Sequence, residues 1–278
     1  MSRSILTESF AANRHHVSPF LMLGDPTPEL SVELAVNAVR VGASMLELGI
    51  PYSDPCADGP VIQKACLRAS SAGVSTGEAL EILAAIHRAE PEVPLNLLVY
   101  GNLVHARGYE RFCQDAVAAG AASLLVPDIP LDEASPLVAA CSAAGLGHVE
   151  MVAPLTTPER LAAIDAVTDA FLYLAAHQGV TGADISADET RSALVSRIAP
   201  AVHNPVCLGF GLSSAANLAA AFGAGARMCV VGSHLVRTIE QTWNDGKGEP
   251  SAVISALTAC LEPLVQVGHE YNNRSEEQ

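Results

Sequence analysis

The chain has 278 residues, of which half are hydrophobic and 16% are charged, so it can bury a large core as one large domain or two small ones. Its formal net charge is −15 and its only lysines are Lys64 and Lys247, a balance that repels nucleic acid and anionic lipid. We therefore expect neither nucleic acid nor a membrane as a partner, and local donors rather than a global positive field must hold any anionic substrate.

Cysteine usage and the N-terminus indicate where the protein works. The seven cysteines are scattered, with no CxxC pair and no Cys/His spacing typical of a metal site, which indicates reduced thiols, a cytoplasmic protein and no bound metal. The first residues, MSRSILTESFAANRHH, contain no apolar signal region. No stretch is expected to reach the roughly 18 apolar residues of a membrane span.

Short apolar runs of β-forming residues recur along the chain, separated by Ala-rich stretches of helical period such as SVELAVNAVRVGA. The runs are PFLML (19–23), MLELG (45–49), LNLLVY (95–100), SLLVP (123–127), HVEMVA (148–153), AFLYLA (170–175), PVCLG (205–209) and MCVVG (228–232). Apolar strands that alternate with helices indicate a parallel sheet covered on its faces.

Eight such units predict an α/β fold, a single (β/α)8 TIM barrel, because about 250 residues are typical of that fold. We expect the barrel to occupy residues 1–271, with an extra N-terminal helix, and residues 272–278 to form a disordered tail. An open doubly wound sheet fits less well, because no GxGxxG follows the first strand and nothing marks a second domain.

Two connections, after the second and sixth predicted strands, are too long for simple turns. The first runs from Ile50 to about Gly77 and is expected to contain a short helix in PVIQKACLRASS. The second, HQGVTGADISADE (177–189), has Gly179 and Gly182 near one end. Loops of this length are usually functional or disordered, and a glycine-flanked loop after a barrel strand is a candidate lid.

Polar residues gather at the C-terminal ends of the predicted strands, where barrel enzymes carry their catalytic groups. They are Asp25, Glu47, Asp58, Tyr100, Asn102, Asp128 and Tyr173, followed by the glycine segments GFG (209–211) and GS (232–233). Glycines let the backbone approach an anion, and GSHL opens a helix whose first N–H groups are unpaired. Together with GVTG (179–182) these segments predict a phosphate site, although each alone is ordinary turn sequence.

Two acids in LELGIPYSDPCADGP are candidates for proton transfer. Glu47 lies in an apolar strand, where burial raises a carboxyl pKa towards neutrality, but it can equally be a structural acid bound to a tyrosine or a backbone N–H. Asp54 and Asp58 precede Pro and Gly, which is ordinary turn chemistry. Cys56, between these acids, has no nearby base and is expected to pack rather than react.

The stretch LELGIPYSDPCADGPVIQKACLRA resembles the signature of the tryptophan synthase alpha-subunit family. The segments PFLMLGDP, LVYGNLV, LLVPDIP, GVTG, GFGLSS and VVGSHLV agree with the family in content and order, over roughly residues 18–240. The resemblance implies a barrel that cleaves indole-3-glycerol phosphate to indole and glyceraldehyde 3-phosphate. This is a retro-aldol reaction without metal or organic cofactor.

The resemblance also implies roles for individual residues. Glu47 would be the general acid/base, and Asp58 would bind the indole N–H and stabilise positive charge there. The residues that would shape the indole pocket are Phe20, Leu98, Tyr100, Leu125, Tyr173 and Phe210. Those that would hold the phosphate are Gly182, Gly211, Gly232 and Ser233, while Thr181 would help to close the lid and position Asp58.

The chain departs from the family pattern in two loops. Ala176 and His177 stand where the family usually has Ser-Arg in the lid, and Cys56 replaces a leucine in the 51–60 loop that meets the beta subunit in the family. Two forms of lyase therefore stay open, a tryptophan synthase alpha subunit and a stand-alone enzyme that releases free indole. The alternative is a catalytically weak alpha-like partner that regulates a beta subunit; another phosphate-binding barrel isomerase lacks a motif of its own.

Overall fold

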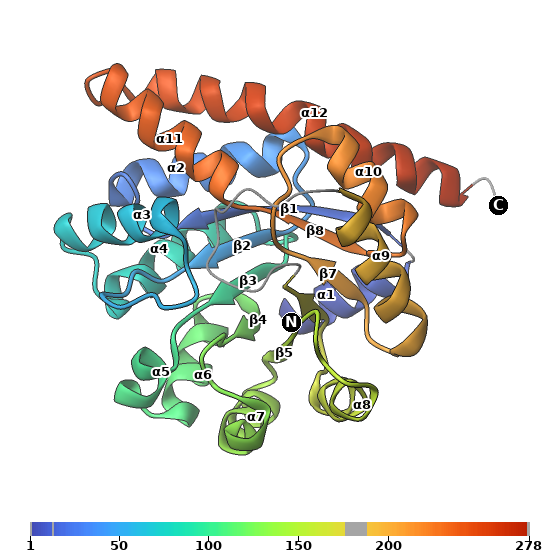
Figure 1. Cartoon of the computed structure of the whole chain (residues 1–278). Helices are drawn as coiled ribbons and strands as arrows, with labels where there is room; N and C mark the ends of the chain where they lie inside the picture. The colour runs from blue at the N-terminus through green and yellow to red at the C-terminus, as the bar shows by residue number, and fades with distance from the viewer. Residues whose placement is uncertain (1, 13, 176–187, 277–278) are drawn as a thin grey trace.

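The computed structural model describes residues 2–12, 14–175 and 188–276, which form one closed barrel (Figure 1). Its strands are β1 (His16–Met22), β2 (Leu46–Gly49), β3 (Leu95–Leu98), β4 (Ala121–Leu125), β5 (Gly147–Val152), β6 (Leu172–Leu174), β7 (Val206–Leu208) and β8 (Met228–Val231). Neighbouring strands are parallel and follow chain order, and β8 closes on β1 through pairs such as His16 with Met228. The predicted TIM barrel is confirmed.

Helices surround the barrel (Figure 1). They are α2 (Pro28–Val41), α3 (Pro60–Ser71), α4 (Thr76–Ala89), α5 (Gly101–Arg107), α6 (Tyr109–Ala118), α7 (Ser135–Ala144), α8 (Pro158–Val167), α9 (Asp188–Ile198), α10 (Ala215–Gly223), α11 (Ser233–Asp245) and α12 (Pro250–Glu276), with short 3₁₀ turns at Leu131–Glu133 and Ala199–Ala201. Local sequence sets several of their ends. Ser75 and Glu78 form a reciprocal capping box at the start of α4, and Gly42 ends α2 in a left-handed conformation.

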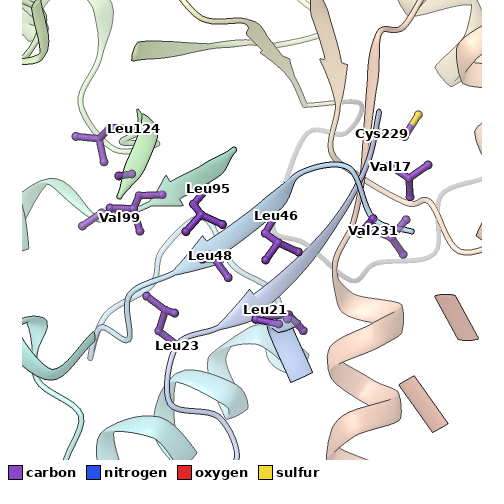
Figure 2. Close-up of a cluster of buried hydrophobic side chains, with 14 of the residues drawn as sticks. Val17, Leu21, Leu23, Leu46, Leu48, Leu95, Val99, Leu124, Cys229 and Val231 are labelled. Atoms are coloured by element: carbon purple, nitrogen blue, oxygen red, sulfur yellow. The ribbon is translucent and has the colours of Figure 1, made fainter. Parts of the chain in front are cut away.

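Buried apolar side chains form two clusters, because strand residues alternate between the helices and the barrel interior. The larger cluster joins strand residues such as Leu46 and Leu48 to helix residues such as Leu83 of α4, so it lies between strands and helices. Figure 2 shows part of it around β1, β2 and β3. The smaller cluster contains Phe20 and Phe171 and fills the interior, so the barrel is a packed core rather than a pore.

The extra N-terminal helix, α1 (Ser2–Ala11), packs against β4. Its Leu6 is buried, and the Phe10 ring lies 5.2 Å from the ring of His16, the first residue of β1. Phe10 also lies 6.0 Å from Phe171, which immediately precedes β6. The helix therefore covers the end of the barrel at which the strands begin, opposite to the predicted site.

The last helix differs from two sequence expectations. α12 continues to Glu276, into the segment expected to be disordered, because Tyr271 and Asn272 are tied to the barrel. The Tyr271 hydroxyl donates to the Ala219 carbonyl at 2.8 Å, and the Asn272 side chain accepts from His15 N–H at 2.6 Å. By length and composition the stretch 250–274 could also cross a membrane, which was not expected, but its packing on α2, α10, α11 and β1 is that of a barrel-covering helix.

Of the two long connections, the one after β2 contains the expected helix, and α3 spans the same residues as PVIQKACLRASS. Its first residue, Pro60, suits the first turn of a helix because it lacks only an N–H that would be unpaired there. The second connection, residues 176–187, lies outside the described residues, and with it lie Thr181, Gly182 and the His177 substitution.

Candidate active site

A cavity of about 320 Å³ lies at the ends of the strands where the loops begin. Its lining includes every predicted site residue within the described ranges: Phe20, Glu47, Asp58, Leu98, Tyr100, Leu125, Tyr173, Phe210, Gly211, Gly232 and Ser233. These residues come from almost the whole length of the chain and from both halves of the barrel. The closed topology therefore brings together what the sequence analysis could place only at separate strand ends.

Glu47 lies in the middle of β2, beside Phe20 of β1 and Asn96 of β3 in the barrel register. Its side chain is buried, and the Tyr173 hydroxyl donates to its Oε2 at 3.1 Å. The Glu47 pKa is raised to about 8, mainly by burial and in smaller part by the nearby Asp58 charge, while the Tyr173 hydrogen bond acts in the opposite direction. Glu47 is therefore protonated at neutral pH and can act as an acid.

Asp58 belongs to the loop after β2, just before α3, and it is buried despite its turn-like sequence. The Tyr100 hydroxyl donates to its Oδ2 at 2.7 Å and accepts from the Ala57 N–H at 3.1 Å. Gln63, in the first turns of α3, donates to the Asp58 carbonyl at 2.8 Å. Burial raises the Asp58 pKa to about 6, with the Tyr100 hydrogen bond acting in the opposite direction. Asp58 is therefore ionised at neutral pH.

The glycine segments form the other part of the cavity. Gly211 has a φ of 72°, which favours glycine, and an added Cβ at Gly209 would overlap the Tyr173 ring. α11 begins at Ser233 after Gly232, which supplies no side-chain cap, whereas Ser214 caps α10. The first N–H groups of α11 are thus left without a side-chain acceptor beside the cavity, which is the arrangement that binds phosphate at helix N-termini.

Three polar strand-end residues do not line the cavity. The carboxylate of Asp25 is held by Arg68, whose Nε and a terminal nitrogen donate at 2.7 and 2.9 Å. Asn102 donates to the Tyr52 hydroxyl, and Asp128 accepts from the Gly101 N–H at 2.7 Å. These side chains support loops, so position at a strand end did not by itself identify a site residue.

Several lining residues escaped the sequence analysis. They are Ala57, Ile62, Pro127, Met151, Arg191, Gly209, Leu212, Ser213, Asn217, Val230, His234 and Arg237. Arg237 was the most accessible to prediction, because it follows Ser233 by four residues on a helix and residues at that spacing share a face. Within the described ranges no group of three His, Cys, Asp or Glu side chains is arranged to hold a metal ion.

The fold and the site define a barrel enzyme that combines a pair of carboxyl groups with an anion-binding helix end. A family model for the tryptophan synthase alpha chain matches residues 6–263. The chain therefore belongs to the tryptophan synthase alpha chain family, and the resemblance seen in its motifs is confirmed. This family membership supports the function expected from that resemblance, which is the cleavage of indole-3-glycerol phosphate.

Individual relatives extend over nearly the whole chain. The tryptophan synthase alpha chain of Nitrosococcus oceani is 39% identical over 268 residues, which cover 95% of this chain and 98% of the relative. The structure of tryptophan synthase subunit alpha from Legionella pneumophila has a TM-score of 0.84 and 30% identity over 97% of this chain and 98% of that one. A chain of the tryptophan synthase a2b2 complex of Pyrococcus furiosus has a TM-score of 0.82 and 32% identity, covering 91% and 99%.

Proposed function

We propose that this chain is a carbon–carbon lyase that cleaves indole-3-glycerol phosphate by acid–base catalysis with Glu47 and Asp58. The observation that carries the proposal is the separation of the two pKa values, about 8 for Glu47 and about 6 for Asp58, within one cavity. Two carboxyl groups whose environments separate their pKa values can serve as acid and as ionised stabiliser at the same pH.

The protonation states suggest an order of steps. Protonated Glu47 donates its proton to C3 of the indole ring, while the Asp58 carboxylate accepts a hydrogen bond from the ring N–H and stabilises the positive charge that the ring acquires. The Glu47 carboxylate then removes the proton from the hydroxyl on the side-chain carbon bonded to C3. The carbon–carbon bond breaks, its electron pair returns to the ring and an aldehyde forms, so Glu47 ends protonated as it began.

The rest of the cavity suits the two ends of this substrate. Phe20, Leu98, Leu125, Tyr173 and Phe210 provide apolar and aromatic surface for the indole, and the Tyr173 and Phe210 rings pack edge to face at 5.9 Å. Gly211, Gly232 and Ser233 suit the phosphate, and Gly182 is proposed to hold it with them, while Thr181 is proposed to help close the lid and position Asp58.

A beta subunit is the proposed protein partner, and the 51–60 loop is its proposed contact. A shallow hollow is lined by Tyr52, Ser53, Asp54, Pro55, Cys56, Gln63 and Leu67. The Leu67 side chain is 62% exposed, which suits a surface that a partner covers. The Pyrococcus relative, whose structure is that of an a2b2 complex, supports such an assembly. The strongly negative charge supports a protein that binds neither nucleic acid nor membranes, and the seven free cysteines support the proposed cytoplasmic location.

Turnover of the purified chain tests the proposal. Indole-3-glycerol phosphate is added, and released glyceraldehyde 3-phosphate is coupled to a dehydrogenase, with and without a beta subunit. Glu47→Gln should lose nearly all activity, whereas Glu81→Gln, an exposed acid on α4, should retain it. Near-equal rates with and without the beta subunit would identify a stand-alone lyase. Tight beta-subunit binding without turnover would instead support the catalytically weak partner.

A further inference from the structure

The negative charge of the chain and of the cavity opposes the binding of a phosphorylated substrate. The chain has a formal net charge of −15, and the cavity itself contains the carboxyl groups of Glu47 and Asp58. A phosphate monoester carries a charge of about −1.5 to −2 at neutral pH. A helix N-terminus contributes only about half a positive charge. Further positive charge near the phosphate end would balance the site.

Among the residues that the structure describes, three basic side chains line the cavity, Arg191, His234 and Arg237. Arg191 belongs to the first turn of α9 and is buried. His234 Nε2 lies 3.4 Å from the Cys260 sulfur, and burial lowers the His234 pKa, as does the charge of Arg237. His234 therefore favours its neutral form, which leaves the two arginines as the positive charges that the described part of the lining supplies.

Arg237 is placed to reach the phosphate end. It follows Ser233 by four residues on α11, so the two side chains share one face of the helix. Helical side chains lean towards the N-terminus, which directs Arg237 back over Ser233 and Gly232. The side chain is exposed, yet it lines the same cavity as these two residues.

Within the part of the chain that the structure describes, the Arg237 side chain has no ion-pair or hydrogen-bond partner. The acid that follows it by three residues, Glu240, is already bound by Arg68 at 2.9 Å and approached by Lys64 at 3.8 Å. An arginine that stays free beside an uncapped helix N-terminus is suited to bind an anion, because its planar guanidinium can donate two parallel hydrogen bonds to phosphate oxygens.

We infer that Arg237 is a phosphate-binding residue of this cavity and that it selects phosphorylated ligands over their unphosphorylated counterparts. Its guanidinium joins Ser233 and Gly232 in holding the phosphate and supplies charge that the helix N-terminus lacks. The inference rests on the proposed function for the identity of the substrate, but the binding of a phosphate monoester can be measured without turnover.

The test compares Arg237→Gln with Arg111→Gln by calorimetric titration with glycerol 3-phosphate and, separately, with indole. Arg111 is a matched control, because its side chain is 75% exposed on α6, outside the cavity, and its replacement changes the net charge equally. Arg237→Gln should weaken glycerol 3-phosphate binding by about tenfold or more, as expected for a charge-assisted hydrogen bond, and leave indole binding unchanged. In the lyase assay it should raise KM much more than it lowers kcat.

Two outcomes would overturn the inference: an affinity of Arg237→Gln for glycerol 3-phosphate within about twofold of wild type, or equal losses in Arg237→Gln and Arg111→Gln, which indicate a general charge effect. If Arg237→Gln does not fold, arginine side-chain resonances of the wild type, assigned with Arg237→Lys, decide instead. Titration with glycerol 3-phosphate must then shift the Arg237 signal, and no shift refutes the role. A wild type that binds glycerol 3-phosphate but turns over no substrate would remove the proposed function and leave this inference standing.

Discussion

Replacing Tyr173 with phenylalanine should shift the alkaline side of the pH–activity profile to higher pH. The change removes the hydroxyl that donates to Glu47 Oε2 at 3.1 Å and keeps the aromatic ring. That hydrogen bond favours ionised Glu47, so it holds the Glu47 pKa down against the burial that raises it to about 8. Its loss therefore raises the pKa. Because the proposed first step needs protonated Glu47, the variant should stay active at more alkaline pH.

The size of the shift follows from the strength of the hydrogen bond. A hydrogen bond to a charged group contributes about 1.5–3 kcal/mol, and one pKa unit corresponds to about 1.4 kcal/mol. The alkaline limb of the pH–activity profile should therefore shift to higher pH by about one unit or more. In the wild type, kcat/KM should increase as Asp58 ionises near pH 6 and decrease as Glu47 ionises near pH 8. Only the second limb should move in Tyr173→Phe.

The assay measures kcat/KM across both limbs by extracting released indole, so that no coupling enzyme contributes its own pH response. Tyr100→Phe serves as a comparison, because it removes the 2.7 Å hydrogen bond to Asp58 and should raise the acid limb instead. Tyr109→Phe on α6 lies outside the cavity and should change neither limb. An alkaline limb that stays in place or moves down in Tyr173→Phe would refute the assignment of Glu47 as the initial acid.

Three further changes test the energetics of the site. Glu47→Gln should be more stable than the wild type above about pH 8 and no more stable below about pH 4.5. Burial raises the Glu47 pKa only in the folded chain, so between these pH values the unfolded wild type ionises first and its folding becomes less favourable. Urea unfolding across this range measures the difference. Arg68→Met leaves the buried Asp25 carboxylate unpaired and should cost about 3 kcal/mol in denaturant unfolding, part of which Asp25→Asn in the same chain should restore. Gly209→Ala places a Cβ against the buried Tyr173 ring, so kcat should fall and the overpacking should also lower the melting temperature.

The fold could be predicted because its signals are local. Apolar runs mark the strands, and PVIQKACLRASS begins with a proline after a glycine and spans α3 as expected. The end of α12 could not be predicted, because it depends on tertiary contacts. Tyr271 and Asn272 continue the helix by bonding to α10 and to the residue before β1, and nothing in the tail sequence indicates those partners.

The site was predictable only in part, for a similar reason. The burial of Glu47 follows from its apolar strand. The sequence around Asp58 predicts an ordinary turn residue, and only the contact with its partner shows that it belongs to the cavity. That partner, Tyr100, lies 42 residues away, and the Tyr173 that holds Glu47 lies 126 residues away. Pairing over such separations is set by barrel closure. The family signature indicated the role proposed for Asp58, and the structure supplies the physical cause of its raised pKa.

Asp25 shows why a strand end alone does not define a catalytic residue. Its carboxylate binds Arg68 of α3, and the same guanidinium donates to Glu240 of α11 at 2.9 Å. α3 begins just after Asp58, and α11 begins at Ser233, so this network ties the helix that follows the acid to the helix proposed to bind the phosphate. Since none of the three side chains lines the cavity, we expect the network to act by fixing the spacing between the two ends of the proposed substrate site. A carboxylate at a strand end is thus expected to serve the proposed chemistry indirectly, by fixing the positions of the two helices that border the site.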